Sequence, residues 1–491
     1  MHVNEANFEP ITVTLKECDP RPHHLNAERK KPIFVNDITT PSATASRNEL
    51  AYDLDRAHVF HSWSAQGALK PLVIAGGQGS RVWDYDGRSY LDFSSQLVNV
   101  NIGHQHPAVT AAIIEQAGRL ATVAPSTATL SRGEAARRIV ERAPEGFNKV
   151  FFTNGGADAI ENAIRMARLH TGRDKVLSTY RSYHGNTGAA IVATGDWRRI
   201  PNEFARGHAH FFGPWLYRSE FWATSPEQES ERALRHLEHV IQSEGPAGIA
   251  AVLLESIPGT AGVLVPPPGY LPGVRSLCDR YGILLILDEV MAGFGRTGNW
   301  FGSQTFGIRP HIMTIAKGLS SGYMPIGGSV VCDEIAHTFE GSGDFNHGYT
   351  YSGHPVAAAV ALENLRIIQE EGIVEHVRDV AHPYLAEQWH SLADHPMVGE
   401  TKLVGLMGSL ALTPNKETRA KFKSEAGKVG FRTRERCFAN NLVMRHVGDR
   451  MILSPPLVIT TDEIDVLMAR ARKSLDESYA GLKADGMFVA A

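Results

Sequence analysis

Short apolar runs recur between about residue 100 and residue 350, and helix-like segments separate them. Strands that are apolar along their whole length are buried on both faces, and strands that alternate with helices form parallel sheets. The chain is therefore predicted to have an α/β core, with a mostly parallel sheet covered on both faces. The predicted strands are Lys149–Phe152, Lys175–Ser178, Ile249–Leu254, Ile283–Leu287, Ile312–Ala316 and Gly328–Cys332.

Composition excludes several classes of protein. The 491 residues include 49 basic and 53 acidic side chains, so the net charge of −4 provides no basic field for nucleic acid. The four cysteines, Cys18, Cys278, Cys332 and Cys437, form no CxxC pair, and neither a disulfide framework nor a metal site is expected. No apolar stretch approaches the ~20 residues of a membrane helix, and the first residues lack the apolar core of a secretory signal. A cytoplasmic protein is expected.

Four segments are expected along the chain. Residues 1–48 are polar and lack sustained periodicity, which predicts an N-terminal arm. Residues 100–355 carry the alternating strands and helices of a large domain. After Pro355 the pattern is mainly helical, with helices predicted over Val356–Glu371 and Glu375–Ala393 and from Thr461. Residues 356–491 are expected to form a smaller α+β domain that residues 49–99 complete.

Three of the apolar runs lead into ionisable residues. Glu255, Asp288 and Lys317 each follow a predicted strand. Ligands of parallel sheets bind beyond the carboxyl ends of the strands, so these residues are candidate site residues. An ammonium group in an apolar site loses hydration, which lowers its pKa and frees the amine to attack a carbonyl. Lys317 alone would more often be a surface charge, but it opens a glycine-rich turn and stands at a strand end that corresponds to those of the two carboxylates.

Two further segments could bind a planar, phosphorylated ligand. The turn Thr153–Ala157 contains two glycines between a predicted strand and a predicted helix, so its amides could hold a phosphate, although a simple tight turn would look alike. Tyr183 could stack on a ring or belong to the core. Thr350 could donate a hydroxyl to an anion or simply form a turn. The glycines of Gly76–Gly79 precede a predicted hairpin and open no helix, so they are no dinucleotide fingerprint.

Together these groups match the needs of pyridoxal phosphate. Its phosphate needs amides and hydroxyls, its ring needs a stacking face, its ring nitrogen needs a carboxylate, and its aldehyde needs a lysine. The chain offers a candidate for each requirement.

Several long motifs resemble those of the class III, or ω-, aminotransferases, which belong to fold type I of the pyridoxal phosphate enzymes. The resemblance runs from about Leu50 to Leu482. It is carried by the segments Asn154–Glu161, Ser182–Gly185, Leu287–Val290, Gly293–Gly298, Ala316–Gly318 and Tyr349–Pro355. The resemblance implies a large domain with a seven-stranded sheet, a smaller α+β domain, and a homodimer with active sites at the subunit interface, or a tetramer.

The resemblance also implies roles for individual residues. Lys317 would bind the cofactor aldehyde and then move a proton between the substrate α-carbon and the cofactor. Asp288 would pair with the ring nitrogen, while Val290 and Tyr183 would pack on opposite faces of the ring. These four residues form the reactive half of the predicted site.

Other residues are implied to surround the cofactor. The amides of Gly156 and Ala157 would hold the phosphate, and Thr350 would reach it from the neighbouring subunit. Glu255 would lie near the hydroxyl edge of the ring, where it could also pair with a substrate-side arginine.

The substrate side of the predicted site rests on three residues. Arg445 matches the mobile arginine that binds a keto acid's carboxylate in this family, and a guanidinium suits two-point contact with a carboxylate. A surface arginine in a hairpin is the alternative. Leu97 and Val98 match a segment in which many amine:pyruvate members have a tryptophan at the position of Val98. The smaller valine should reshape the pocket, so a preference for aromatic amines does not carry over.

The activity expected from the resemblance is transfer of an amino group from an ω-amino acid or amine to pyruvate, giving L-alanine and an aldehyde or ketone. β-Alanine, taurine and diamines are candidate donors. An aminomutase or a decarboxylase on the same fold is the alternative. A nicotinamide-dependent oxidoreductase and a non-enzymatic binding protein are less favoured. Neither nucleic acid nor a membrane is expected as a partner.

Overall fold

The computed structural model describes residues 46–203, 206–341 and 344–488. The chain divides into two compact units, residues 1–68 and 69–491. In the first unit, helix α1 (Arg47–His58) begins with a capping box in which Ser46 and Glu49 exchange hydrogen bonds of 2.8 and 3.2 Å. The predicted arm, residues 1–48, lies outside the described residues except for its last three positions.

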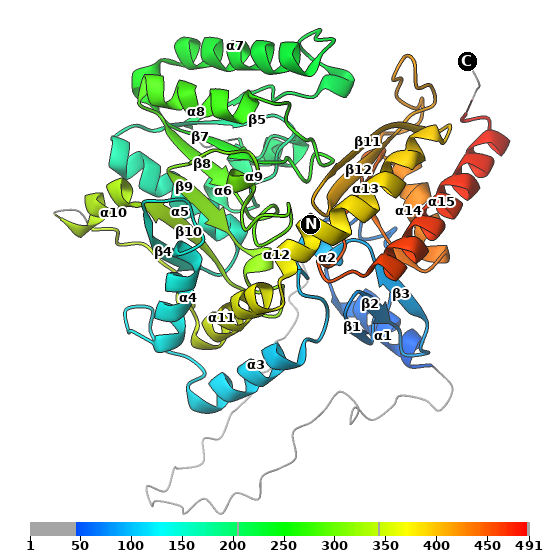
Figure 1. The fold of residues 1–491 in the computed structure, drawn as a ribbon, viewed down its shortest axis with the longest axis horizontal. Helices are drawn as coiled ribbons and strands as arrows, with labels where there is room; N and C mark the ends of the chain where they lie inside the picture. Colours follow the sequence, from blue (N-terminus) through cyan, green and yellow to red (C-terminus); the bar gives the residue numbers. More distant parts are fainter. Residues whose placement is uncertain (1–45, 204–205, 342–343, 489–491) are drawn as a thin grey trace, which may run out of the picture. The chain divides into compact units, whose positions relative to one another are not determined.

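A seven-stranded sheet forms the centre of the second unit (Figure 1). Six of its strands match the six runs predicted from the sequence. Strands β5 to β9 pair in parallel, whereas β10 pairs antiparallel with both β4 and β9. In spatial order the strands are β4 (Phe147–Thr153), β10 (Gly327–Cys332), β9 (Ile312–Ile315), β8 (Leu284–Asp288), β7 (Ile249–Glu255), β5 (Lys175–Thr179) and β6 (His208–Phe211).

Two features of this sheet differ from a simple parallel pattern. β10 runs antiparallel because the chain returns from β9 through a short connection that holds no crossover helix, and a parallel return needs such a crossover. The edge strand β6 was not predicted, because its sequence His-Ala-His-Phe contains no continuous apolar run. An edge strand packs against only one neighbour, and its sequence is correspondingly less apolar.

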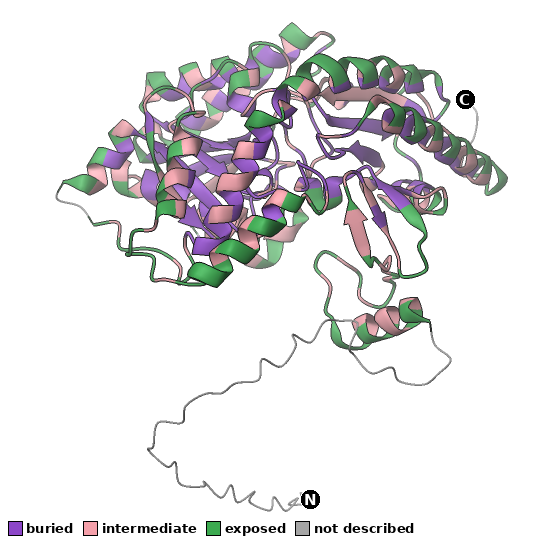
Figure 2. Ribbon diagram, turned by 60° about the horizontal axis from the view of Figure 1, so that its bottom comes forward, coloured by how far each residue is buried: buried purple, intermediate pink, exposed green. Residues whose placement is uncertain are grey.

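Helices cover both faces of the sheet, as the apolar strands predict. Along β7, Leu253 packs in the same cluster as Ile160 of α5, whereas Val252 packs in the opposite cluster with Leu237 of α7. Figure 2 shows the strands buried and the outer helix faces exposed. The helices of this region are α3 (Pro107–Arg119), α4 (Leu130–Val140), α5 (Gly156–Thr171), α6 (Gly188–Ala193), α7 (Pro226–Glu244), α8 (Tyr270–Tyr281), α9 (Gly302–Thr305), α10 (Asp333–Glu340) and α11 (Pro355–Glu370).

Two four-stranded sheets and several helices complete the unit. One sheet contains the hairpin predicted after Gly79, formed by β2 and β3, and it joins distant parts of the chain, because β3 pairs in parallel with β13. The domain boundaries stay a prediction. The two sheets are β1 (Gly76–Gln78), β2 (Arg81–Trp83), β3 (Ser89–Asp92) and β13 (Leu442–Val443), and β11 (Val398–Val404), β12 (Met407–Leu412), β15 (Arg450–Leu453) and β14 (Arg445–Val447). The helices are α2 (Ser95–Val98), α12 (Ile373–Glu375), α13 (His382–Ser391), α14 (Lys428–Ala439) and α15 (Thr461–Ala484).

The helix predicted over Glu375–Ala393 is interrupted. Residues His376–Ala381 form a π-helical turn before α13, and Pro383 occupies the first turn of α13. Proline has no N–H group to donate to the carbonyl four residues earlier. A regular α-helix therefore does not continue through Pro383, and α13 begins as a separate helix there.

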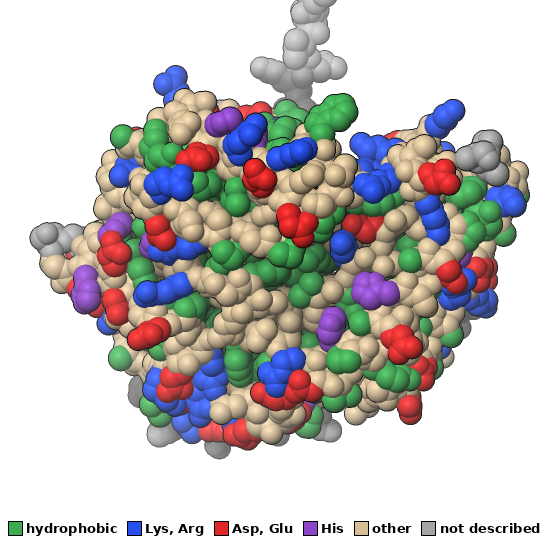
Figure 3. Space-filling model, turned by 45° about the horizontal axis from the view of Figure 1, so that its top comes forward, with side chains coloured by type: hydrophobic (Ala, Val, Ile, Leu, Met, Phe, Trp, Pro, Cys, Tyr) green, Lys and Arg blue, Asp and Glu red, His purple; other side chains and the backbone are tan. Residues whose placement is uncertain are grey.

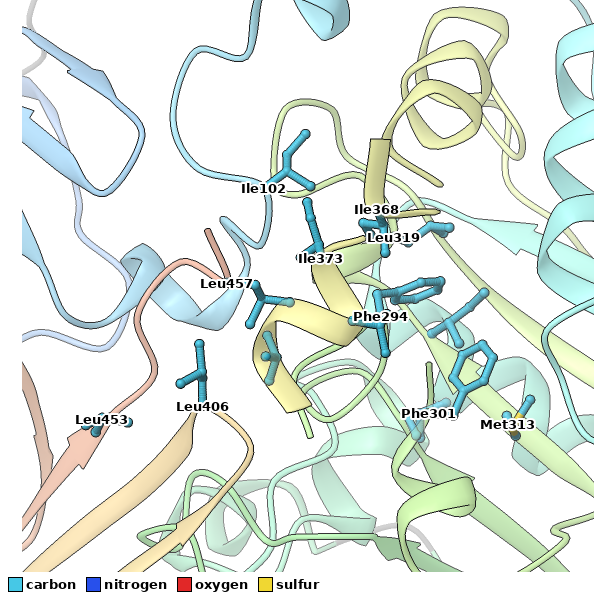
Figure 4. Close-up of a cluster of buried hydrophobic side chains, with 14 of the residues drawn as sticks. Ile102, Phe294, Phe301, Met313, Leu319, Ile368, Ile373, Leu406, Leu453 and Leu457 are labelled. Atoms are coloured by element: carbon cyan, nitrogen blue, oxygen red, sulfur yellow. The ribbon is translucent and has the colours of Figure 1, made fainter. Parts of the chain in front are cut away.

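Buried side chains from distant segments hold these parts together. Ile102, Phe294 and Leu457 belong to one apolar cluster, although they lie far apart in the sequence (Figure 4). On the face drawn in Figure 3, basic and acidic side chains are interspersed. Within the described residues, no helix has the length and apolar character needed to cross a membrane.

Candidate active site at the strand ends

The structure brings the three predicted strand-end residues to one edge of the sheet. Glu255 is the last residue of β7 and pairs in register with Asp288, the last residue of β8. Asp288 in turn pairs with Thr314 of β9, and Lys317 follows that strand. Because β7, β8 and β9 are parallel, two carboxylates and one amine meet beyond their carboxyl ends.

Lys317 is held in an unusual backbone conformation. Its φ of 44° lies in the left-handed region, which costs energy for a residue with a side chain and often marks a functional site. Loss of hydration and, to a smaller extent, the positive charge of Arg445 together lower the pKa of its amine to about 8, although Asp288 and Glu255 oppose this change. Within the described chain, no hydrogen-bond partner occupies the amine, so it is available to a ligand.

Asp288 is fixed by two hydrogen bonds. Its Oδ1 accepts the backbone N–H of Val290 at 3.0 Å, and its Oδ2 accepts Nδ1–H of His184 at 2.8 Å. The sequence motif Ser182–Gly185 contains His184, but sequence reasoning gave that residue no role. The histidine ring is fully buried, and its Nε2 has no partner among the described residues. Through this hydrogen bond, His184 fixes the orientation of the Asp288 carboxylate.

Glu255 connects the sheet edge to the stacking tyrosine predicted from the sequence. Its Oε1 accepts the backbone N–H of Tyr183 at 3.0 Å, and its Oε2 accepts that of Gly259 at 2.8 Å. Burial raises the pKa of this carboxyl to about 7, with His184 opposing the rise and Asp288 adding to it. Both Tyr183 and Glu255 thus belong to the same site as Asp288.

The first turn of α5 forms the predicted anion site. Its N-cap is Gly155, and no side chain caps the turn, so the first amides of this 16-residue helix have no side-chain partner among the described residues. Unpaired amides and the helix dipole favour a negatively charged ligand. A Cβ on Gly156 would lie 3.0 Å from the side-chain methyls of Val290, which shows how closely this turn packs against the residue beyond β8.

Arg445 lies in β14 within electrostatic reach of Lys317. Its pKa is lowered by burial and by the positive charge of Arg198. In the part of the chain that the structure describes, Arg445 has no carboxylate partner, so its charge is left for a ligand. β14 pairs antiparallel with β15, so Arg445 lies in a hairpin, the setting that the alternative interpretation had assumed.

The remaining predicted residues have different surroundings. Val98 is buried against Met291 and Ile257 and has a φ of 62°, which is strained for a β-branched residue. Leu97 is 42% exposed. Thr350 is exposed in the turn before α11, and no hydrogen bond joins it to the described residues of this site.

Comparison with known proteins places the chain in a family. The model of the class-III aminotransferases matches residues 63–475. Putrescine–pyruvate aminotransferase of Pseudomonas aeruginosa is 43% identical over 84% of this chain and 92% of its own length. Diaminobutyrate–2-oxoglutarate transaminase of Halomonas elongata is 34% identical over 89% of this chain and 98% of its own length.

Solved structures agree with this assignment. Taurine:2-oxoglutarate aminotransferase from Bifidobacterium kashiwanohense, in complex with PLP and glutamate, is 38% identical, with a TM-score of 0.84 over 88% of this chain and 98% of that chain. The ω-transaminase from Pseudomonas jessenii, in complex with PMP, is 33% identical, with a TM-score of 0.83 over 88% of this chain and 99% of that chain. The chain belongs to the class-III aminotransferases, and it is a pyridoxal phosphate-dependent enzyme of fold type I.

The residues brought together here fit that cofactor. The uncapped turn of α5 offers amides to a phosphate, and the unpartnered amine of Lys317 faces the same edge of the sheet as Asp288. Val290 sits against Gly156, so one apolar side chain lies next to the phosphate-binding turn. The site therefore combines the amine of Lys317, the fixed carboxylate of Asp288 and the free amides of α5.

Proposed function

We propose that this aminotransferase moves an amino group from an ω-amino acid or an amine to pyruvate, giving L-alanine and an aldehyde or ketone. β-Alanine, taurine and diamines are the candidate donors. The similarity to a putrescine–pyruvate aminotransferase supports a diamine donor and pyruvate as acceptor. Other relatives are named for 2-oxoglutarate, which makes that acid the main competing acceptor.

The observation that carries the proposal is the partly enclosed Lys317 amine with a pKa of about 8, beside Asp288 and Glu255. When bound, pyridoxal phosphate supplies a ring that withdraws electrons from the reacting carbon. Lys317 holds the cofactor and then takes and returns the proton of the donor carbon, for which a pKa near neutrality is suited. Asp288, oriented by His184, keeps the ring nitrogen protonated.

The other contacts to the cofactor are assigned by the same reasoning. Gly156 and Ala157 would donate backbone N–H groups to the phosphate at the start of α5. Val290 and Tyr183 would enclose the ring, and Glu255 fixes the backbone of Tyr183. Each of these groups positions the ring, and none exchanges a proton with the substrate.

On the substrate side, Arg445 binds the carboxylate of the acceptor, because its charge is unpaired in the described chain and lies near Lys317. Leu97 and Val98 form part of the pocket wall. Thr350 is assigned to the phosphate site of a neighbouring subunit in a homodimer or a tetramer. A cytoplasmic location stays a prediction from the sequence.

The test is a donor and acceptor panel. Purified protein loaded with pyridoxal phosphate is mixed with β-alanine, taurine, putrescine or an arylalkyl amine, and the visible absorbance of the cofactor is followed. Pyruvate or 2-oxoglutarate is then added, and alanine or glutamate is measured. We expect one donor class to bleach the band and pyruvate to restore it with stoichiometric alanine. The matched control is Lys317→Ala, which should lose turnover.

Other outcomes identify other reactions. Release of carbon dioxide from the donor would indicate a decarboxylase, and an isomeric amino acid without alanine would indicate an aminomutase. Restoration by 2-oxoglutarate alone would overturn the proposed acceptor and keep the donor half of the proposal. Near-normal turnover by Lys317→Ala would overturn the assigned role of Lys317.

A further inference from the structure

A guanidinium covers one face of the tyrosine ring in the active site. The Cζ atom of Arg198 lies 4.2 Å from the centroid of the Tyr183 ring, well within the range of a cation–π contact. The backbone of Tyr183 is anchored by Glu255, but within the described residues no hydrogen bond reaches its hydroxyl. The orientation of the ring therefore depends on what packs against its faces.

Arg198 is itself held in place by a carboxylate two residues earlier. Its Nε lies 3.0 and 2.9 Å from the two carboxylate oxygens of Asp196, and its Nη2 also contacts Oδ2. Its backbone N–H donates to Oδ1 at 2.9 Å, so Asp196 caps the 3₁₀ helix Trp197–Asn202. A planar fork fixed at several points loses little freedom when it stacks on a ring.

The position of Arg198 also relates it to the substrate side of the site. Its positive charge lowers the pKa of Arg445, so the two guanidiniums lie within electrostatic reach of each other. Arg198 thus contacts the ring that is assigned to the cofactor and also acts on the arginine that is assigned to the acceptor carboxylate. Its pairing with Asp196 leaves it less free than Arg445 to bind an anion itself.

We propose that Arg198 is a positioning residue, which Asp196 holds against one face of the Tyr183 ring so that the other face lies flat on the pyridoxal phosphate ring. This inference rests on the stacking role that the proposed function gives to Tyr183. It adds two residues, Arg198 and Asp196, whose side chains do not touch the reacting atoms and act through the tyrosine.

The same short helix provides a matched control. Arg199 is the next residue, its Cζ lies 5.4 Å from the ring of Tyr180, and its Nε pairs with Glu203 at 2.6 Å. Arg199→Met therefore removes a guanidinium of the same kind from the same helix without touching Tyr183. An effect of Arg198→Met that Arg199→Met lacks is therefore not a general result of losing an arginine from this helix.

The experiment compares Arg198→Met, Arg198→Lys, Asp196→Asn and Arg199→Met with the unchanged protein. Apo-protein is titrated with pyridoxal phosphate to obtain its Kd, and the visible circular dichroism of the bound cofactor is recorded. We expect Arg198→Met to raise the Kd about three- to tenfold and to weaken the circular dichroism band, because one cation–π contact on Tyr183 is lost. Arg198→Lys should recover part of both losses, and Asp196→Asn should give a smaller loss of the same kind.

Unchanged Kd and circular dichroism in both Arg198→Met and Asp196→Asn would overturn the inference, as would equal losses in Arg199→Met. Thermal unfolding of each apo-variant separates a folding defect from a positioning defect. If Arg198→Met folds poorly, Asp196→Asn still tests the inference. Tyr183→Ala distinguishes the two levels of the proposal. An unchanged Kd in Tyr183→Ala contradicts the stacking role itself, whereas a raised Kd there with an unchanged Kd in Arg198→Met contradicts only the role of Arg198.

Discussion

The lowered pKa of Lys317 predicts how fast the apo-protein takes up its cofactor at different pH values. The pKa falls from 10.5 to about 8, which is about 3 kcal/mol in the free energy of protonation. At pH 7, an amine with a pKa of about 8 is neutral in about one molecule in ten, against about one in three thousand for an ordinary lysine. The reactive fraction of Lys317 is therefore raised about 300-fold.

Only the neutral amine attacks the aldehyde, so the rate should rise with pH and level off above about pH 8. Arg445→Met removes a like charge and should move the midpoint to higher pH. The displacement should stay below about one pH unit, because loss of hydration contributes more to the lowered pKa than Arg445 does. The assay is stopped-flow measurement of the visible band that forms when apo-protein is mixed with pyridoxal phosphate.

Two references make the measurement specific. The reaction of free pyridoxal phosphate with N-acetyl-lysine corrects for the titration of the cofactor itself. Arg434→Met is the control for loss of an arginine, because Arg434 pairs with Glu435 on α14 and is not among the charges that act on Lys317. A midpoint near 10 in the unchanged protein would refute the reasoning about Lys317, and an unmoved midpoint in Arg445→Met would refute the part that concerns Arg445.

Three further predictions concern the surroundings of Lys317. Gly156→Ala should raise the Kd for pyridoxal phosphate about tenfold, because the new methyl group would press on Val290, whereas Gly155→Ala should change little, since nothing lies within 4 Å of a Cβ there; equal effects in an equilibrium titration would contradict this. Asp288→Asn should slow the donor half-reaction about 10²- to 10³-fold in single-turnover absorbance measurements, because a fixed negative charge at the ring nitrogen is lost; a loss below threefold would contradict the role of Asp288. Burial raises the pKa of Glu289 from 4.5 to about 7, so the folded protein binds this proton more tightly than the unfolded chain and loses stability as pH rises between these values. The stability of Glu289→Gln apo-protein, measured by thermal unfolding, should fall less between pH 5 and pH 8 than the stability of the protein without the substitution. An identical fall in both proteins would contradict this prediction.

Much of the fold could be read from local sequence pattern. Six strands of the large sheet were predicted because continuous apolar runs have to be buried on both faces, and the helices beginning at Pro355 and Thr461 were predicted from their periodicity. Strand β6 and the direction of β10 could not be read in this way. The first lacks an apolar run, and the second depends on the absence of a crossover helix rather than on the strand's own residues.

Some residues of the candidate site could likewise be predicted from local sequence pattern, and others could not. Glu255, Asp288 and Lys317 were recognisable because each follows an apolar run, and a parallel sheet gathers the ends of its strands at one edge. The partners of these residues were not recognisable. His184 reaches Asp288 from 104 positions away, and Arg198 of the 3₁₀ helix Trp197–Asn202 covers the ring of Tyr183.

The sequence by itself determined the class of fold, the cofactor and the residues at the strand ends, because these follow from local apolar pattern and from motifs with fixed spacing. The tertiary structure alone decided which side chain orients Asp288, which one covers Tyr183, and that Arg445 lies close enough to lower the pKa of Lys317. Hydrogen bonds, stacking contacts and electrostatic effects depend on distances of a few ångströms between residues far apart in the chain. Such distances are fixed by strand register and loop conformation, which local pattern does not specify.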